Sequence, residues 1–326
     1  MQRGAFIISL DFELMWGVWD SKSIESYGVN ILEVHNIIPR LINLFEKYSV
    51  GATFATVGFL HLHDKKELIN NFPEHLPRYA NSKYNPYLSY IENLREEDRP
   101  YYFAPQLIEL IRKSGFQEIG THTYAHIYCL EDGMSEEAFE SDLCKSIEIA
   151  NKRQISIHSL VFPRNQFNET YIEICSKYGL TSYRGNESSW IYAAKNGEGE
   201  SLIRRGVRLM DSYINLTGHH CYKFTEQSSK PSIINIPSSR FLRPYNTKLS
   251  FLESLKMKRI KNSMTHAAKN NLMYHLWWHP HNFGNNTNEN FRQLEEILQH
   301  YQILNKKYSF QNHTMASFAK FYTDGN

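Results

Sequence analysis

Two carboxylates near the start of the chain are spaced so that they could serve one catalytic site. Asp11 and Glu13 follow a short apolar run, Ala5–Leu10, that is typical of a buried strand. On an extended backbone, residues two apart point to the same side, so both carboxylates can enter one cavity. The alternative is that both are solvated carboxylates that cap the next element.

Two histidines offer a metal site for these carboxylates. His122 and His126 are four residues apart and come directly after the predicted strand Gln117–Gly120. On a helical turn, side chains at i and i+4 lie on one face and can reach one metal ion. Two histidines and one carboxylate leave coordination positions for water and substrate, as in catalytic rather than structural sites. With 15 histidines in the chain, such a pair can also arise by chance.

Strands that alternate with helices would position these residues. Apolar, β-rich runs predict strands, and segments of 3.6-residue periodicity predict the helices between them. The predicted strands are Ala5–Leu10, Gly51–Val57, Gln117–Gly120, Ser156–Phe162, Leu180–Tyr183, Ser232–Ile236 and Leu272–Trp278. The predicted helices are Pro39–Tyr48, with Pro39 in its first turn, Ala104–Lys113, Ser135–Asn151, with Ser135 as N-cap, Glu169–Tyr178, Leu249–Ala268 and Asn288–Lys306. This alternation predicts parallel βαβ units, and about seven of them favour a barrel over an open sheet.

Two stretches interrupt the alternation. His61–Tyr102 is polar, aromatic and proline-bearing, and we expect it to form an insertion over the barrel mouth. The alternative is a surface excursion, helical around Leu88–Leu94, that packs against the barrel or a second subunit. The other stretch, Trp190–Tyr222, carries a cluster of arginines. We find no linker or repeat, so we predict a single domain over residues 1–326 with an insertion at about 61–102.

The composition excludes several classes of function. Lys plus Arg total 36 against 34 Asp plus Glu, and a formal charge of +2 gives no electrostatic footprint for nucleic acid. The four cysteines show no CxxC spacing and predict reduced thiols. The N-terminus lacks the apolar core of a signal peptide, and no run approaches the roughly 18 apolar residues of a spanning helix. We therefore expect a cytoplasmic protein with no transmembrane segment; a homo-oligomer stays open.

Together, these segments resemble the polysaccharide deacetylases, the NodB-homology group that forms carbohydrate esterase family 4. Asp11-Phe12-Glu13 resembles the acidic first motif, and His122–His126 matches the metal motif H-[ST]-x-x-H. Phe162–Gln166 looks like the third motif, and Leu276–His279 matches L-x-x-H, the fifth. The likeness covers almost the whole chain apart from the two interrupting stretches. It implies an α/β fold of the distorted (β/α)7, TIM-like barrel type.

The chain departs from the usual family pattern at two motifs. The first motif normally has adjacent aspartates, whereas Asp-x-Glu spacing occurs in a side branch with peptidoglycan deacetylase-like and allantoinase-like enzymes, where metal use is less uniform. The fourth motif, an Asp that orients the acid histidine, has only Asp211 as a candidate. A surface carboxylate near the arginines is an equal interpretation of Asp211.

The resemblance implies a role for each motif residue. Asp11 would be the general base, and Glu13, His122 and His126 would hold a divalent metal, with zinc expected and nickel, cobalt or iron as alternatives. Arg164 would keep Asp11 ionised and oriented. His279 would protonate the leaving amine, and His281 is the alternative acid.

The function that these roles favour is removal of an acetyl or formyl group from a sugar nitrogen. A nucleotide-linked or lipid-linked sugar in surface-polysaccharide biosynthesis suits a protein without a signal peptide, and Arg240 and Arg243 could bind its phosphate. Surface ion pairs are the alternative for these arginines. Tyr84 and Tyr87 of the insertion would pack on the sugar. Two other functions stay open: ring opening of a cyclic amide, and glycan binding by a metal-free barrel that has lost the chemistry.

Overall fold

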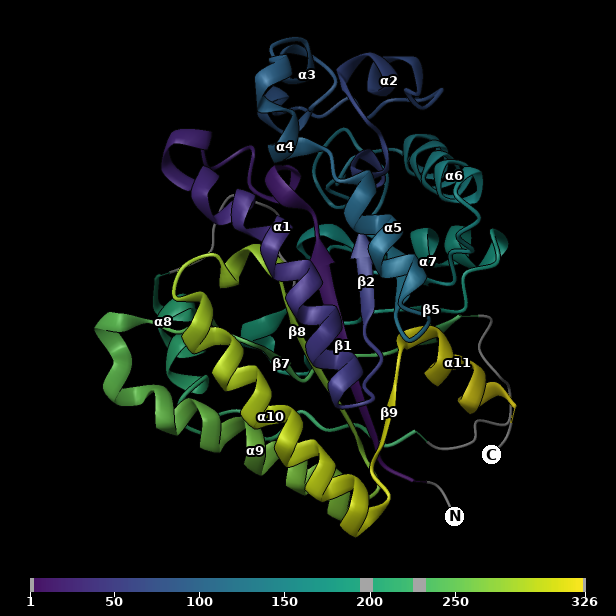
Figure 1. Cartoon of the computed structure of the whole chain (residues 1–326). Helices are drawn as coiled ribbons and strands as arrows, with labels where there is room; N and C mark the ends of the chain where they lie inside the picture. Colours follow the sequence, from purple (N-terminus) through teal and green to yellow (C-terminus); the bar gives the residue numbers. More distant parts are fainter. Residues whose placement is uncertain (1–2, 194–201, 225–232, 325–326) are drawn as a thin grey trace.

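Strand β1 (Ala5–Phe12) lies inside a parallel sheet, and all eight of its residues are buried. It appears at the centre of Figure 1. The structure is a computed structural model that describes residues 3–193, 202–224 and 233–324. On one side β1 pairs with β8 (Met273–Trp278). On the other side its first half pairs with β9 (Gln311–His313) and its second half with β2 (Thr53–Thr56). A strand buried on both faces has no polar face, which explains its apolar sequence.

The sheet continues through five short strands and curls into the predicted barrel. Its order is β6-β5-β4-β3-β2-β1-β8-β7, and the strands not yet bounded are β3 (Glu118–Thr121), β4 (Ser159–Leu160), β5 (Ser182–Tyr183), β6 (Ile234–Asn235) and β7 (Arg240–Phe241). The segment 234–241 pairs with β5 through β6 and with β8 through β7. Between them, the Ser238 N–H donates to the Gly185 carbonyl and the Ser239 N–H to the His275 carbonyl. One segment thus bridges both edges of the sheet, which confirms the barrel.

Alternate residues of β1 face the two sides of the barrel wall. Ala5 and Ile7 belong to a small apolar cluster with Ala55, Val161 and Ile236, from neighbouring strands. The intervening residues of β1 join the large cluster between the barrel and its helices. Ser9 and Asp11 continue the first of these faces, because side chains two apart along a strand share a face. The strand therefore carries Asp11 into the interior at its carboxyl end.

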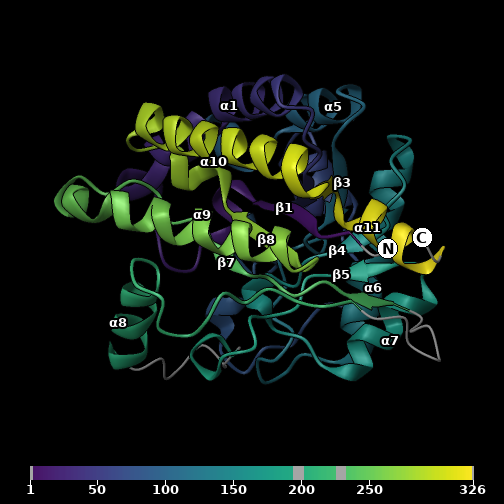
Figure 2. The ribbon, with the colours of Figure 1, turned by 90° about the horizontal axis from the view of Figure 1, so that it is seen from below.

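Helices surround the barrel (Figures 1 and 2). They include α1 (Ile24–Lys47), α5 (Pro105–Lys113), α6 (Glu136–Lys152), α7 (Glu169–Lys177), α8 (Leu202–Asp211), α9 (Glu253–Lys269), α10 (Thr287–Tyr308) and α11 (Met315–Thr323). The predicted start of the first helix is wrong: α1 begins after Ser23, which forms a capping box with Ser26, and Pro39 lies inside the helix. The predicted N-cap Ser135 is confirmed, since its hydroxyl accepts from the Ala138 N–H.

The predicted insertion lies beyond the carboxyl ends of β1 and β2, at the top of Figure 1. It contains the short helices α2 (Lys65–Asn70), α3 (Ser89–Glu92) and α4 (Arg99–Tyr102). The second interrupting stretch forms α8, although its residues 194–201 lie outside the described part of the chain, as does Ser232 of a predicted strand.

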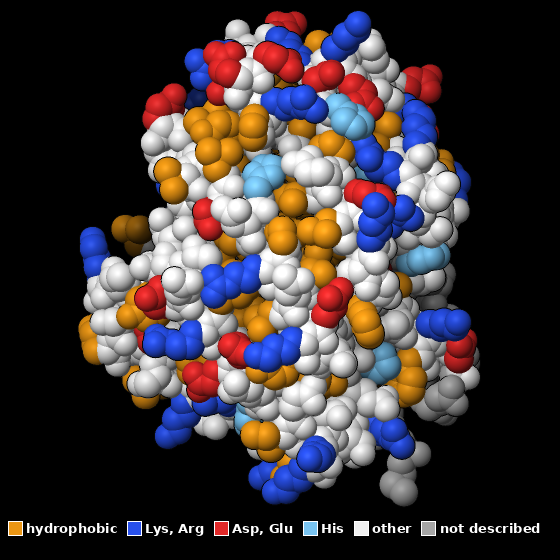
Figure 3. Space-filling model, in the orientation of Figure 1, with side chains coloured by type: hydrophobic (Ala, Val, Ile, Leu, Met, Phe, Trp, Pro, Cys, Tyr) orange, Lys and Arg blue, Asp and Glu red, His pale blue; other side chains and the backbone are white. Residues whose placement is uncertain are grey.

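The described surface agrees with the modest net charge. On the face drawn in Figure 3, positive and negative side chains are interspersed. Within the described ranges, we find no helix with the length and apolar character needed to cross a bilayer.

Candidate active site and metal centre

Asp11 is held by an arginine at the carboxyl end of the barrel. Both guanidinium Nη atoms of Arg184 donate to its carboxylate, at 2.6 and 2.8 Å, and Nη1 also donates to Ser9. Arg184 is 1% exposed and its guanidinium lies 4.1 Å from the centre of the Trp277 ring. Burial alone would raise the pKa of Asp11, but the Arg184 charge and hydrogen bonds hold it below its ordinary value. Asp11 is therefore a buried, ionised carboxylate.

The predicted contact between Arg164 and Asp11 is wrong. Arg164 forms its ion pair with Asp20, and its guanidinium lies over the Tyr128 ring at 3.7 Å. Arg164 and Asn165 both have φ of 53°, a left-handed turn that directs the Arg164 side chain away from the barrel interior. Sequence reasoning missed Arg184, although its position offered a clue. Arg184 directly follows the predicted strand Leu180–Tyr183, much as Arg164 follows the predicted strand Ser156–Phe162.

Glu13 lies at the centre of four histidines. Its Oε2 is 3.3 Å from His122 Nε2 and 3.2 Å from His126 Nε2. Its Oε1 is 3.2 Å from His281 Nε2 and 3.6 Å from His279 Nε2. Burial raises the pKa of Glu13, but the His279 charge and the imidazole hydrogen bonds lower it by more than burial raises it. The net pKa of Glu13 therefore lies well below its ordinary value. The structure thus brings together all the histidines that the sequence singled out.

Gly17 makes room for this carboxylate. A Cβ atom at Gly17 would lie only 1.9 Å from Glu13 Oε1, so any larger residue would displace the carboxylate from the cluster. This requirement is invisible in the sequence, where Gly17 follows the apolar Leu14–Trp16 with no sign of a site.

The two motif histidines lie on a loop and not on a helical turn, which corrects the predicted geometry. Thr123 has φ of 62° and His126 has φ of 54°, both left-handed and uncommon for these residue types. The turn is held by Asp142 of α6, whose carboxylate accepts from the backbone N–H groups of Tyr124 at 2.6 Å and Ala125 at 3.1 Å. Asp142 is thus a positioning residue that the motif did not reveal.

The Glu13, His122 and His126 set fits a divalent cation. Zinc bonds of about 2.0–2.1 Å in a tetrahedron require ligand atoms roughly 3.3 Å apart, close to the two distances from Glu13 Oε2. The ligand atoms of the three residues all lie within 4.8 Å of one another. His122 Nδ1 donates to the Val161 carbonyl at 2.7 Å, which directs its Nε2 lone pair toward Glu13. Burial lowers the pKa of His126, which favours the neutral imidazole that metals bind.

His279 lies within reach of both carboxylates. Its Nε2 is 3.6 Å from Asp11 Oδ2, and its side chain is 24% exposed. The backbone N–H of His279 donates to Asn282 Oδ1, the His279 Nδ1 lies 3.2 Å from the same oxygen, and the Asn282 backbone N–H donates to the His279 side chain. Asn282 therefore orients the imidazole, a role that the sequence analysis had considered for Asp211.

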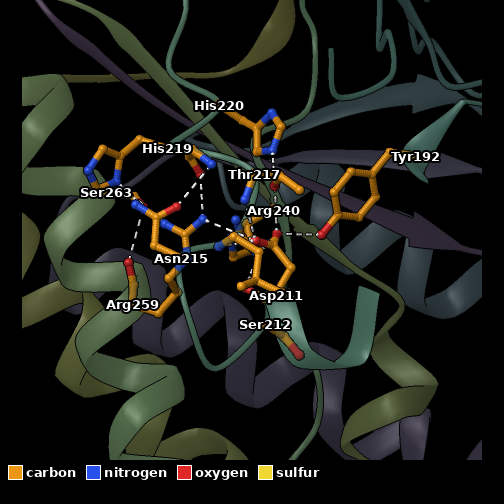
Figure 4. A network of polar contacts seen from close by, with 12 residues as sticks. Tyr192, Asp211, Ser212, Asn215, Thr217, His219, His220, Arg240, Arg259 and Ser263 are labelled. Carbon is orange, nitrogen blue, oxygen red and sulfur yellow. Dashed lines mark hydrogen bonds and ion pairs between the residues drawn. The ribbon is translucent and has the colours of Figure 1, made fainter. Parts of the chain in front are cut away.

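Asp211 instead anchors a separate buried network (Figure 4). Its carboxylate accepts from Arg240 Nη1 at 3.1 Å and from Tyr192, and Arg259 lies 3.7 Å away. Arg240 is 3% exposed, so the predicted phosphate contact of Arg240 is wrong: its guanidinium is committed to Asp211 in the interior. Arg243 is only partly buried, and its phosphate contact stays a prediction.

The structure separates the two predicted tyrosines of the insertion. Tyr84 is partly exposed and packs edge-on against Tyr128 at 5.3 Å, and the Tyr128 ring in turn contacts His126. Tyr87 is 6% exposed and packs on Phe59 in the core, so its predicted contact with substrate is wrong. The Tyr87 hydroxyl is also buried without a hydrogen-bond partner.

Substitutions at the two tyrosines should have different effects. Tyr87→Ala should lower the free energy of unfolding by about 3–5 kcal/mol, the usual cost of truncating a buried aromatic residue. Tyr87→Phe should cost little, because it removes only an unpaired hydroxyl. Tyr84→Ala should leave stability within about 0.5 kcal/mol and raise KM. Urea denaturation and steady-state kinetics measure these effects, and an unchanged KM in Tyr84→Ala would remove Tyr84 from the substrate site.

The sequence comparison agrees with this geometry. Residues 25–183, which include the loop of His122 and His126, match the family model described as polysaccharide deacetylase. The match covers just under half of the chain, and over these residues the chain is similar to the polysaccharide deacetylases. Asp11, Glu13 and His279 lie outside the matched residues, and the structure brings them to the loop of the family match. No curated protein matches the sequence.

Solved structures share the fold of this chain. A Mycobacterium smegmatis protein assigned as a polysaccharide deacetylase has a TM-score of 0.55 at 13% identity, over 99% of this chain and 91% of that one. Puue allantoinase has a TM-score of 0.55 at 10% identity, with the same coverage of 99% and 91%. A Pseudomonas aeruginosa PAO1 protein, also assigned as a polysaccharide deacetylase, has a TM-score of 0.52 at 11% identity over 99% and 91%. At these identities the likeness shows the fold alone.

Proposed function

We propose that this protein is a metal-dependent hydrolase that removes an N-acyl group, acetyl or formyl, from a sugar. The observation that carries the proposal is the convergence of three functions around Glu13: a carboxylate–imidazole set that fits a cation, an ionised Asp11 and an accessible His279. The match of residues 25–183 to the polysaccharide deacetylase model supports the reaction class.

The proposed chemistry divides between the cation and the side chains around it. A divalent cation, with zinc as our first choice and nickel, cobalt or iron as alternatives, would be held by Glu13, His122 and His126 and would supply Lewis acidity and a more acidic water. Asp11 accepts the proton of the attacking water, because Arg184 keeps its carboxylate ionised.

His279 is the residue we propose as general acid. Its Nε2 is 3.6 Å from Asp11 Oδ2, so the proton taken by Asp11 can pass to the imidazole and then to the leaving nitrogen. Burial lowers the pKa of His279, whereas Glu13 and Asp11 raise it, and the net pKa lies below the ordinary value. A less basic imidazole gives up its proton more readily. His281 is more enclosed, at 4% exposed, which favours His279 over His281.

For the substrate, we propose a sugar that packs on the rim formed by Tyr84 and Arg164, above the buried ring of Tyr128. The Arg164 guanidinium covers both tyrosine rings, at 5.1 and 3.7 Å from their centres. The partly exposed Tyr84 ring offers a surface for sugar C–H groups, and Arg164 offers a cation for an acidic substituent. A nucleotide- or lipid-linked sugar of surface-polysaccharide biosynthesis, handled in the cytoplasm by a single-domain enzyme, is our specific proposal.

Metal removal tests this function directly. The double variant His122→Ala/His126→Ala should lose bound zinc, measured by mass spectrometry, and should lose acetate or formate release from a panel of N-acyl sugars. His220→Asn, a buried histidine outside the cluster, is the matched control and should keep both. Cyclic amides belong in the same panel. Ring opening without release of acid from any sugar would favour the alternative function, and equal metal content in the two variants would contradict the site.

A further inference from the structure

The Glu13 carboxylate presents two separate faces to two pairs of histidines. Its Oε2 faces the Nε2 atoms of His122 and His126, and its Oε1 faces the Nε2 atoms of His279 and His281. The ligand atoms of Glu13, His279 and His281 lie within 4.8 Å of one another, as do those of the first set. The carboxylate thus lies between two groups of atoms that could each bind a cation. The proposed reaction needs a cation in only one of these groups.

The orientation of His279 and His281 suits a bound cation, as does that of His122 and His126. His281 is 4% exposed, and its Nε2 is buried without a hydrogen-bond partner. The Tyr27 hydroxyl contacts His281 Nδ1 at 3.1 Å, which fixes the ring with Nε2 toward Glu13. The Nδ1 of His279 faces Asn282, so Nε2 is the ring nitrogen that it presents to the cluster. Partners on the far nitrogen that fix the ring and tautomer are typical of metal-binding histidines.

We propose that Glu13, His279 and His281 form a second divalent-cation site, joined to the first by Glu13 as a bridging carboxylate. The spacings of 3.2 and 3.6 Å from Oε1 match the roughly 3.3 Å between ligand atoms of a tetrahedral site. The two imidazole donors favour transition metals such as zinc or nickel over calcium and magnesium, and the carboxylate also suits manganese. Two-metal sites in hydrolases have ions about 3.5–4 Å apart, a separation that one carboxylate can bridge.

The second cation would have a consequence for turnover that rests on the proposed function. A nitrogen that binds a cation has no lone pair for a proton, so His279 cannot be a ligand and a general acid at once. Occupation of the second site should therefore inhibit the enzyme, and the activity should pass through a maximum as the cation concentration increases.

The number of bound cations tests the site without any substrate. The metal-free protein, titrated with Mn²⁺, should bind two ions per chain, and the electron paramagnetic resonance spectrum of the saturated protein should show two exchange-coupled ions. One ion per chain at saturation, with an uncoupled spectrum, would overturn the proposal. This measurement uses the unmodified chain, so it does not depend on whether any variant folds.

A variant assigns the second ion to its ligands. His281→Asn should reduce the stoichiometry from two ions to one and abolish the coupling, whereas His220→Asn should keep two ions. Two coupled ions in His281→Asn would contradict the assignment. A protein that binds two ions but hydrolyses no substrate would overturn the proposed function and support the second site; an active protein with a single ion would do the opposite.

Discussion

Replacing Asp11 with asparagine is expected to reduce kcat by about 10²–10⁴-fold, the contribution of a general base, while the protein keeps its metal. Asparagine cannot accept the proton of the attacking water, yet it preserves the size of the side chain and one acceptor for Arg184. The measurements are acid release under saturating substrate and zinc content by mass spectrometry.

Glu13→Gln is the matched variant, because Glu13 is the proposed ligand two residues along the same chain segment. It should lose metal as well as activity. If Asp11→Asn releases the metal and Glu13→Gln retains it, the roles of the two carboxylates are exchanged.

Arg184→Met is expected to lower the free energy of unfolding at neutral pH by about 3–5 kcal/mol, the cost of leaving a buried charge without its partner. Arg184 is 1% exposed and its partner Asp11 is 3% exposed, so solvent cannot replace the lost contact. Arg164→Met is the control, since the Arg164 side chain is 31% exposed and should cost no more than about 1 kcal/mol.

The effect of Arg184→Met should also depend on pH. In the wild type the pKa of Asp11 is lowered, so its contribution to stability is full above the ordinary pKa of about 3.9 and is lost as pH falls through the folded pKa. Without Arg184, burial dominates and raises the pKa of Asp11, so the variant loses stability as pH rises. The difference between the two proteins should thus increase from pH 4 to pH 7. Urea denaturation at several pH values measures it, and a difference independent of pH would contradict the Arg184–Asp11 link.

The long strands were predictable because their hydrophobic pattern is determined by burial alone. Ala5–Leu10 and Leu272–Trp278 correspond to β1 and β8, whose residues are buried on both faces. Strands β7 and β9 were missed: β7 has two residues and β9 three, and their pairing depends on where a curled sheet brings distant segments together. The start of α1 was predicted too late, because Pro39 was taken as part of its first turn, whereas the helix begins after the N-cap Ser23.

The candidate site shows a similar division between local and distant information. Glu13, His122, His126 and His279 were each marked by residue type after a predicted strand, and the structure brings them together. The choice between Arg164 and Arg184 required the backbone turn at Arg164, which no spacing rule predicts. Tyr87 was assigned to the substrate from the composition and position of the insertion, and Arg240 from its residue type after a predicted strand. Packing with Phe59 and pairing with Asp211 commit these two side chains to the interior.

The pairing of β1 implies an order for the biosynthesis of the active site. Ala5 is in register with both Met273 and Gln311, so the strand that carries Asp11 obtains two of its three partners from the last fifth of the chain. Such contacts between distant parts of a sequence form slowly during folding. On the ribosome, Asp11 would emerge long before Met273 and Gln311, so its strand cannot be enclosed until β8 and β9 are synthesised. We therefore expect the nascent chain to expose this apolar strand until β8 and β9 have emerged, and chaperones that bind extended apolar segments should recognise it there.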